Sequence, residues 1–248
     1  MNEIPETSAP VAVYRGESRE IDPGACFHWL RRGWLMFMVN PGILIGCSTL
    51  LLVMLMAIGI VPIFGQIAAH LLLPLFGAGM IRICQRIDQG EQPEIPDLFA
   101  GFRHNAGQLV MVGLYFAMGI FGIAFIAFLL VSTGLLSGTI IARIGSMSFE
   151  LSAGFIVGLI VILLSMPVIM ATWYAPAMVL LHEMKPQDAM RASFLAGARN
   201  FVPMLIFATF LIVALFFAML PAFLGLVLFV PVVSGAVYAS YRDIFTGN

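Results

Sequence analysis

Residues 33–81 read GWLMFMVNPGILIGCSTLLLVMLMAIGIVPIFGQIAAHLLLPLFGAGMI and contain no Asp, Glu, Lys or Arg. A transmembrane helix needs about 20 apolar residues to cross the roughly 30 Å hydrocarbon core of a bilayer. This stretch is long enough for two such helices, and a turn signal, VPIFG at residues 61–65, lies near its middle. Because lipid offers no hydrogen bonds to free backbone groups, both segments must be helical. The stretch therefore predicts a hairpin of two transmembrane helices.

Three further uncharged stretches extend this pattern along the chain, at residues 104–142, 151–182 and 200–241. The last of them is long enough for two spans and has a turn signal, LPA, at residues 220–222, whereas the other two hold one span each. The sequence lacks the period-two alternation of apolar and polar residues that would indicate a β-barrel. The predicted fold is an all-α integral membrane protein with six transmembrane helices, at residues 42–61, 66–84, 107–131, 153–175, 202–220 and 223–241.

The composition excludes most other classes of protein. Of the 248 residues, 61% are apolar and only 10% are charged, and the mean hydropathy is +1.02. Soluble domains are closer to half apolar and a quarter charged, so this chain has too few charges to cover a surface that faces water. A cytosolic enzyme, a nucleic-acid-binding module, a disordered chain and a disulfide-rich secreted domain are therefore excluded, and no nucleic acid is expected as a partner.

The distribution of Lys and Arg predicts the orientation. With six spans, eleven of the twelve basic residues fall on one side of the membrane and only Arg143 falls on the other. Basic residues are enriched in cytoplasmic loops, so both termini should be cytoplasmic. Residues 1–22 are polar, lack the apolar core of a signal peptide and are expected to form a disordered tail. Residues 23–248 then form one six-span membrane domain.

An internal repeat emerges when the spans are taken in pairs. Each odd-numbered span follows an asparagine that could cap the helix, and each even-numbered span contains a proline followed by small residues. These positions are Asn40, Asn105 and Asn200, and Pro74, Pro167 and Pro231. We interpret each unit as a short cytoplasmic interfacial helix followed by a helical hairpin; chance recurrence of these residues at helix ends is the alternative.

Basic and aromatic residues gather beside the predicted cytoplasmic ends of the spans. This combination is typical of side chains that lie at the level of the lipid headgroups. The predicted interfacial anchors are Trp29, Arg31, Arg32, Trp34, Arg103, Arg199 and Arg242. Membrane lipids are the expected partners, and a membrane-protein partner is the alternative for these segments.

The spans carry few groups that could support chemistry. Ionisable residues inside a membrane are usually functional, but no Asp, Glu, Lys or Arg lies at mid-span, which disfavours a proton-coupled transporter. His70 is the titratable residue inside a span, and a hydrogen bond to a neighbouring helix is its simplest role. Together with Pro74 and Pro167, where proline could expose backbone carbonyls, it forms the candidate transport site. Without a nucleophile or metal-ligand motif, neither catalysis nor a cofactor is expected.

Five short segments resemble those of a known family. They are PLFGAGM at residues 74–80, DLFAGFR at 97–103, WYAPA at 173–177, AMRASF at 189–194 and YASYRDIF at 238–245. In order and spacing they resemble an uncharacterised family of bacterial six-span inner-membrane proteins. The layout is more distantly similar to the membrane domain of some glycerophosphodiester phosphodiesterases, although no catalytic domain is present. The resemblance implies location and topology and transfers no functional residues.

Two functions are consistent with these features. The first is a non-enzymatic inner-membrane protein that supports other membrane components by binding lipid or a protein partner. The alternative is a passive transporter or channel for an uncharged or lipidic solute, which would use the histidine and prolines of the spans.

Overall fold

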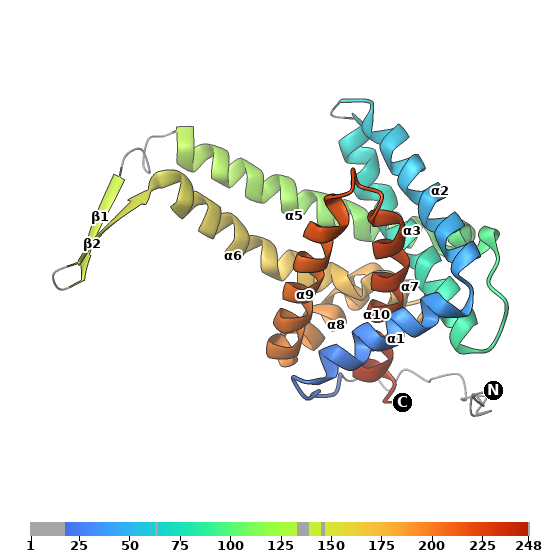
Figure 1. Cartoon of the computed structure of the whole chain (residues 1–248). Helices are drawn as coiled ribbons and strands as arrows, with labels where there is room; N and C mark the ends of the chain where they lie inside the picture. The colour runs from blue at the N-terminus through green and yellow to red at the C-terminus, as the bar shows by residue number, and fades with distance from the viewer. Residues whose placement is uncertain (1–17, 63, 133–138, 145–146, 248) are drawn as a thin grey trace.

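The framework of the protein is helical. The computed structural model describes residues 18–62, 64–132, 139–144 and 147–247 (Figure 1). For residues 139–144 and 147–153 it describes the backbone alone. The helices are α1 (Ala25–Val39), α2 (Pro41–Gly59), α3 (Phe64–Asp88), η1 (Ile95–Phe99), α4 (Ala100–Arg103), α5 (Ala106–Ser132), α6 (Ala153–Trp173), α7 (Ala175–His182), α8 (Pro186–Arg199), α9 (Phe201–Met219) and α10 (Leu226–Phe245). The strands are β1 (Thr139–Ile144) and β2 (Met147–Ser152).

Five segments are long and apolar enough to cross a membrane. They are α2, α3, α5, the continuous segment Gly154–His182 that contains α6 and α7, and α9. Each coincides with a predicted span to within a few residues, except that Gly154–His182 continues beyond residue 175. The sixth predicted span corresponds to α10, which forms a helix of 20 residues but carries Arg242 and Asp243 in its last turns. The structure thus confirms a multi-span helical fold with five candidate spans.

The connection between α5 and α6 contains an element that the sequence did not predict. Strands β1 and β2 pair in antiparallel register, from Thr139 opposite Ser152 to Ile144 opposite Met147. A chain that returns on itself between two antiparallel helices can satisfy its backbone in this way, and β-branched residues such as Thr139, Ile140 and Ile141 favour strands. The all-α description therefore needs this one amendment for the described residues.

A side chain from a distant helix separates α6 from α7. In an uninterrupted helix the Tyr174 N–H would donate to the carbonyl of Met170. Here it donates to Ser193 Oγ (3.0 Å), and the Ser193 hydroxyl donates to the Met170 carbonyl (2.6 Å). The hydroxyl from α8 thus completes the hydrogen bonds of the broken turn, and insertion of this kind is a known cause of helix breaks.

The packed core lies at the end of the molecule that contains α1, α8 and the last turns of α10. Helix α10 packs most extensively on α1 and also contacts α2, α3 and α9. Glycines lie at this contact: a Cβ on Gly33 would lie 2.4 Å from the Val232 carbonyl oxygen, and a Cβ on Gly235 would lie 2.9 Å from the Gly33 Cα. Small residues allow helices to approach in this way in membranes. In contrast, α5 and α6 project away from the other helices (Figure 1), and about half of their large apolar side chains are exposed.

The three asparagines of the predicted repeat have different roles. Asn40 accepts a hydrogen bond from the Ile43 N–H (3.4 Å) and so caps α2 as expected. Asn105 has a left-handed backbone (φ 57°) and donates to the Val179 carbonyl (3.3 Å). Asn200 makes no capping bond to α9. A shared capping function therefore does not explain why asparagine recurs at these positions.

Candidate functional site

The residues of the candidate transport site lie on two helices. His70 and Pro74 are one turn apart on α3, and Pro74 is buried. The Nδ1 atom of His70 lies 2.6 Å from the Gln66 carbonyl oxygen, within the same helix rather than on a neighbouring one. Its ring stacks on Phe116 of α5 with a centroid distance of 5.7 Å. Pro167 is exposed on α6, so it does not share the surroundings of the other two.

Five of the seven predicted anchors are open to the surroundings of the protein. Arg31 and Trp34 are exposed on α1, Arg103 is exposed at the end of α4, and Arg199 is exposed at the end of α8. Arg32 is partly exposed, with Nη2 4.0 Å from Asp88 Oδ1. We call the exposed basic residues and aromatics of α1, α4 and α8 the interfacial collar: Phe27, Arg31, Trp34, Phe102, Arg103, Arg191, Phe194 and Arg199.

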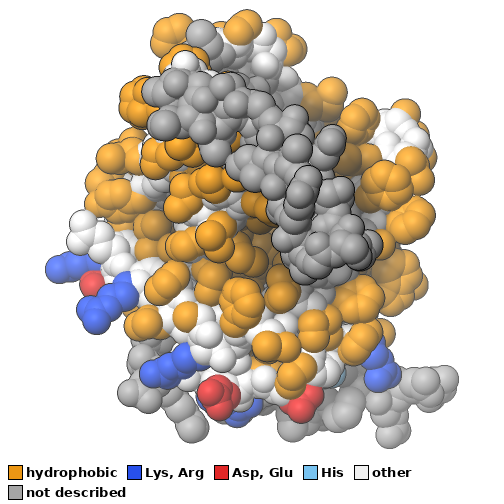
Figure 2. All heavy atoms as spheres, turned by 90° about the vertical axis from the view of Figure 1, so that its left-hand side faces the viewer, with side chains coloured by type: hydrophobic (Ala, Val, Ile, Leu, Met, Phe, Trp, Pro, Cys, Tyr) orange, Lys and Arg blue, Asp and Glu red, His pale blue; other side chains and the backbone are white. Residues whose placement is uncertain are grey.

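The interfacial collar borders an apolar surface. In Figure 2, hydrophobic side chains cover most of the visible face, whereas the Lys, Arg, Asp and Glu side chains gather at the lower end. Helix α1 shows why: it buries Cys26, Trp29 and Gly33 at helical spacing and exposes Arg31 and Trp34 between them. A helix of this kind suits the boundary between hydrocarbon and headgroups.

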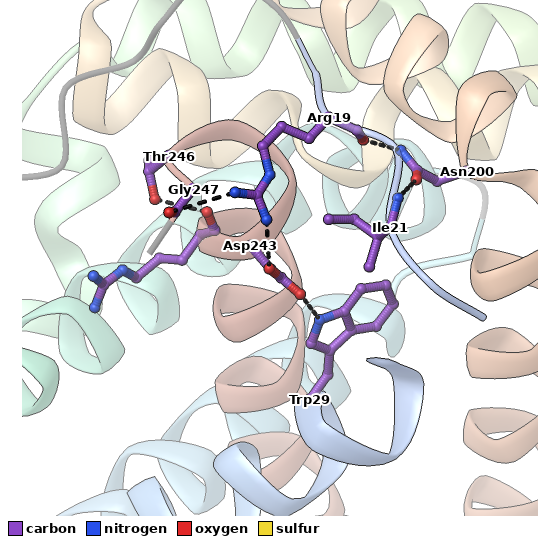
Figure 3. A network of polar contacts seen from close by, with 8 residues as sticks. Arg19, Ile21, Trp29, Asn200, Asp243, Thr246 and Gly247 are labelled. Carbon is purple, nitrogen blue, oxygen red and sulfur yellow. Dashed lines mark hydrogen bonds and ion pairs between the residues drawn. The ribbon is translucent and has the colours of Figure 1, made fainter. Parts of the chain in front are cut away.

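Trp29, the sixth predicted anchor, belongs to the core. It is fully buried, packs edge-to-face on Phe207 with a centroid distance of 5.4 Å, and donates its Nε1–H to Asp243 Oδ2 (2.9 Å). The same carboxylate pairs with Arg19 at 3.5 Å (Figure 3). The indole N–H of Trp29 is thus satisfied by the protein rather than by the headgroup layer.

Arg242, the seventh predicted anchor, is also buried, with 8% of its side chain exposed. Its Nη1 group forms an ion pair with Asp88 at the end of α3. Tyr238, one turn earlier on α10, donates its hydroxyl to the same carboxylate (3.4 Å). A buried charge needs such partners because removal from water is costly, so this pair joins the ends of α3 and α10.

A short strap runs from Ser18 to Asp22 and fastens the start of the described chain to its end. The Ile21 N–H donates to Asn200 Oδ1 and Asn200 Nδ2 donates to the Arg19 carbonyl, both at 2.8 Å. The Arg19 N–H donates to the Ile244 carbonyl (2.9 Å). Figure 3 shows the two contacts with Asn200. The predicted disordered tail therefore does not extend to residue 22; residues 1–17 lie outside the described part of the chain.

Sequence reasoning missed the polar residues that join the helices at this end. Tyr174, which is buried, donates its hydroxyl to Ser240 Oγ (3.0 Å), and His182 Nε2 lies 2.5 Å from the Tyr241 hydroxyl. One usable signal was present for the ion pair, because Asp88 and Arg242 both follow predicted cytoplasmic span ends. Within the described ranges, no group of three or more His, Cys, Asp or Glu side chains is placed to hold a metal ion.

An apolar surface formed by several spanning-length helices, with charged side chains at one end, defines a multi-pass helical membrane protein. By sequence, the chain is similar to a protein of Burkholderia thailandensis that is named as a probable inner membrane protein, with 27% identity over 190 residues, covering 73% of this chain and 70% of the relative. No known family profile and no solved structure matches the chain. The similarity to the glycerophosphodiester phosphodiesterases finds no support in these comparisons.

Proposed function

We propose that this protein is a non-enzymatic, six-span inner-membrane protein whose interfacial collar binds anionic phospholipids of the cytoplasmic leaflet. The observation that carries the proposal is the position of the exposed arginines: Arg31, Arg103, Arg191 and Arg199 are exposed on α1, α4 and α8, the helices that precede α2, α5 and α9. Each basic residue near an anionic leaflet contributes about 1 kcal/mol of attraction. Together the four supply enough attraction to concentrate anionic lipid around this end.

Two details of the topology belong to the proposal. The first is that α10 is the sixth span: its 20 residues are about 30 Å long, and its charged residues, Arg242 and Asp243, lie at the charged end. The second is that this end faces the cytoplasm, because the six-span arrangement puts eleven of the twelve basic residues of the sequence on that side of the membrane. The hairpins α2–α3, α5–α6 and α9–α10 would then be three successive units.

Cysteine labelling tests this topology. We expect a cysteine at Glu91 to react with a membrane-impermeant maleimide only from the cytoplasmic side, and a cysteine at Thr139 to react only from the opposite side. The three native cysteines are buried, so they add little background. Labelling of both positions from one side would contradict the six-span arrangement.

Native mass spectrometry of the purified protein tests lipid binding. In nanodiscs that mix phosphatidylglycerol and phosphatidylcholine, we expect the wild-type protein to retain phosphatidylglycerol preferentially. The double variant Arg31→Gln/Arg199→Gln should lose part of this preference, whereas Arg31→Lys/Arg199→Lys, which keeps both charges, should retain it. Equal retention of the two lipids by the wild-type protein, or movement of a solute across liposomes by the purified protein, would contradict the proposal.

A further inference from the structure

A pocket of about 320 Å³ opens at the charged end, between the last turns of α3, the segment η1–α4, the start of α5 and the end of α7. A volume near 300 Å³ is at the lower end of the range for small-molecule sites and is too large for a single ion. The lining residues are Arg82, Gln85, Pro96, Asp97, Ala100, Arg103, His104, Asn105, Leu180, Leu181 and Glu183.

Two guanidinium groups in this pocket are available to an anion. Arg82 is partly buried and donates from Nη1 to Gln85 Oε1 (2.6 Å). Neither Arg82 nor Arg103 forms an ion pair with any carboxylate of the described residues. Guanidinium groups bind phosphate oxygens through paired hydrogen bonds, and such charge-assisted bonds are about twice as strong as neutral ones.

The two acidic residues of the lining, Asp97 and Glu183, differ in whether a cation neutralises their charge. The Asp97 carboxylate is held by Arg86 (2.8 Å) and by the Glu94 N–H (2.8 Å), so Arg86, which does not line the pocket, neutralises it. Glu183 is exposed and has a left-handed backbone (φ 51°) after the last turn of α7. Its negative charge repels an anion, so removal of this charge should strengthen the binding of an anion in the pocket.

The wall that carries Arg103 is held rigidly against α3. A Cβ on Gly79 would lie 1.9 Å from the Leu98 carbonyl oxygen, and a Cβ on Gly101 would lie 2.4 Å from the Leu75 carbonyl oxygen. These contacts fix the backbone of η1–α4 at two points, one at Leu98 in η1 and one at Gly101 in α4. The two arginines therefore belong to elements whose separation is set by packing, as a preorganised site requires.

We propose that this pocket binds a phosphoester, with Arg82 and Arg103 holding the phosphate oxygens. Asn105 and His104 supply further polar contacts, and Leu180 and Leu181 contact the carbon atoms next to the phosphate. The inference rests on the proposed function, because it gives the lipid-binding end of the protein one defined site. The same chemistry would recognise a phospholipid headgroup or a soluble phosphate compound.

Two probes separate these sources. Calorimetry on the full-length protein in detergent measures binding of methyl phosphate and inorganic phosphate, and native mass spectrometry measures retention of phosphatidic acid and phosphatidylglycerol. If the site binds a lipid headgroup, the protein should retain the lipids and show no measurable binding of the soluble anions. If the site binds a soluble compound, the protein should bind methyl phosphate in detergent. Either result supports the pocket; failure of all four probes to bind overturns it.

Variants show whether the bound phosphate is in this pocket. We expect Arg82→Gln and Arg103→Gln each to weaken binding about tenfold or more, because each removes a charge-assisted contact. Glu183→Gln should strengthen binding. Lys185→Gln, just before α8, removes a positive charge from an exposed side chain outside both the pocket and the interfacial collar, and should change the pocket's affinity by less than about twofold.

The outcomes also separate this inference from the proposed function. If Lys185→Gln weakens binding as much as Arg82→Gln, the protein has a diffuse basic surface, which overturns the pocket and leaves the interfacial collar as the lipid-binding surface. If the pocket variants lose binding while Arg31→Gln/Arg199→Gln keeps its lipid preference, the pocket stands and the collar proposal fails. A far-ultraviolet circular dichroism spectrum equal to that of the wild type excludes misfolding as the cause.

Discussion

Substitution of Gly79 by alanine should destabilise the protein far more than the same change at Gly77, two residues earlier on α3. A Cβ on Gly79 would lie 1.9 Å from the Leu98 carbonyl oxygen, where ordinary contacts begin at 3.4 Å. At Gly77 nothing lies within 4 Å of the same atom. The two variants therefore add one methyl group to the same helix and differ in what that methyl group meets.

The expected loss of stability in Gly79→Ala depends on how far the Leu98 carbonyl oxygen has to move. The Gly79 methyl group needs about 1.5 Å more room, and the atom in its way belongs to the backbone, so η1–α4 has to move as a unit. Overpacking of this kind costs about 1–3 kcal/mol, and a backbone obstacle places this variant near 3 kcal/mol. Gly77→Ala should be neutral or stabilising by up to about 1 kcal/mol, because alanine favours the helix more than glycine does.

Equilibrium unfolding in mixed micelles with increasing dodecyl sulfate, followed by circular dichroism, measures the difference. We expect the free energies of unfolding of the two variants to differ by about 3–4 kcal/mol, with Gly79→Ala the less stable. Since η1–α4 forms one wall of the pocket, Gly79→Ala should also weaken phosphate binding, while Gly77→Ala should leave it unchanged. Equal stabilities would show that Leu98 does not approach α3 as closely as the structure has it.

Three further perturbations test other contacts at the charged end. Asp88→Ala should lower the free energy of unfolding by about 3–5 kcal/mol, because it leaves Arg242 buried without its partner. The double variant Asp88→Ala/Arg242→Met should be more stable than Asp88→Ala, and a less stable double variant would refute the ion pair. Asn200→Ala removes both hydrogen bonds to the strap, so trypsin should cleave after Arg19 faster than in the wild type, and an unchanged rate would show that other contacts hold the strap. A membrane-permeant maleimide should modify the three cysteines only after unfolding, since each is at most 1% exposed, and rapid labelling of the native protein would contradict this packing.

The positions of the helices were predictable because the absence of charge is a local property of the sequence. The uncharged stretches placed all six predicted spans on helices, and the turn at residues 61–65 falls between α2 and α3. Pro176, at the start of α7, is a local signal for the break between α6 and α7. The insertion of Ser193 into this break was not predictable, because Ser193 comes from a helix that follows in the chain. The β-hairpin lies between the predicted spans 107–131 and 153–175, where no regular element was predicted.

The same limit applies to the charged end. Trp29 and Arg242 have the residue types and positions of interfacial anchors, and only the approach of α10 to α1 and α3 provides Asp243 and Asp88 as their partners. The pocket draws Arg82 and Arg103 from different elements. The sequence indicates that these residues lie on one side of the membrane and contains no local signal that they line one site.

Salt separates the two ways in which the charged end could bind lipid. Charges on the interfacial collar are exposed, and exposed charges are screened over about 10 Å at 0.1 M salt and about 3 Å at 1 M. Arg82 is partly buried within a pocket that walls off solvent on several sides, so its attraction for a phosphate is screened less. Raising the salt from 0.1 to 1 M should therefore remove the general preference for phosphatidylglycerol and leave the Arg82-dependent binding. If both disappear in parallel, the arginines of the pocket act as surface charges like those of the collar.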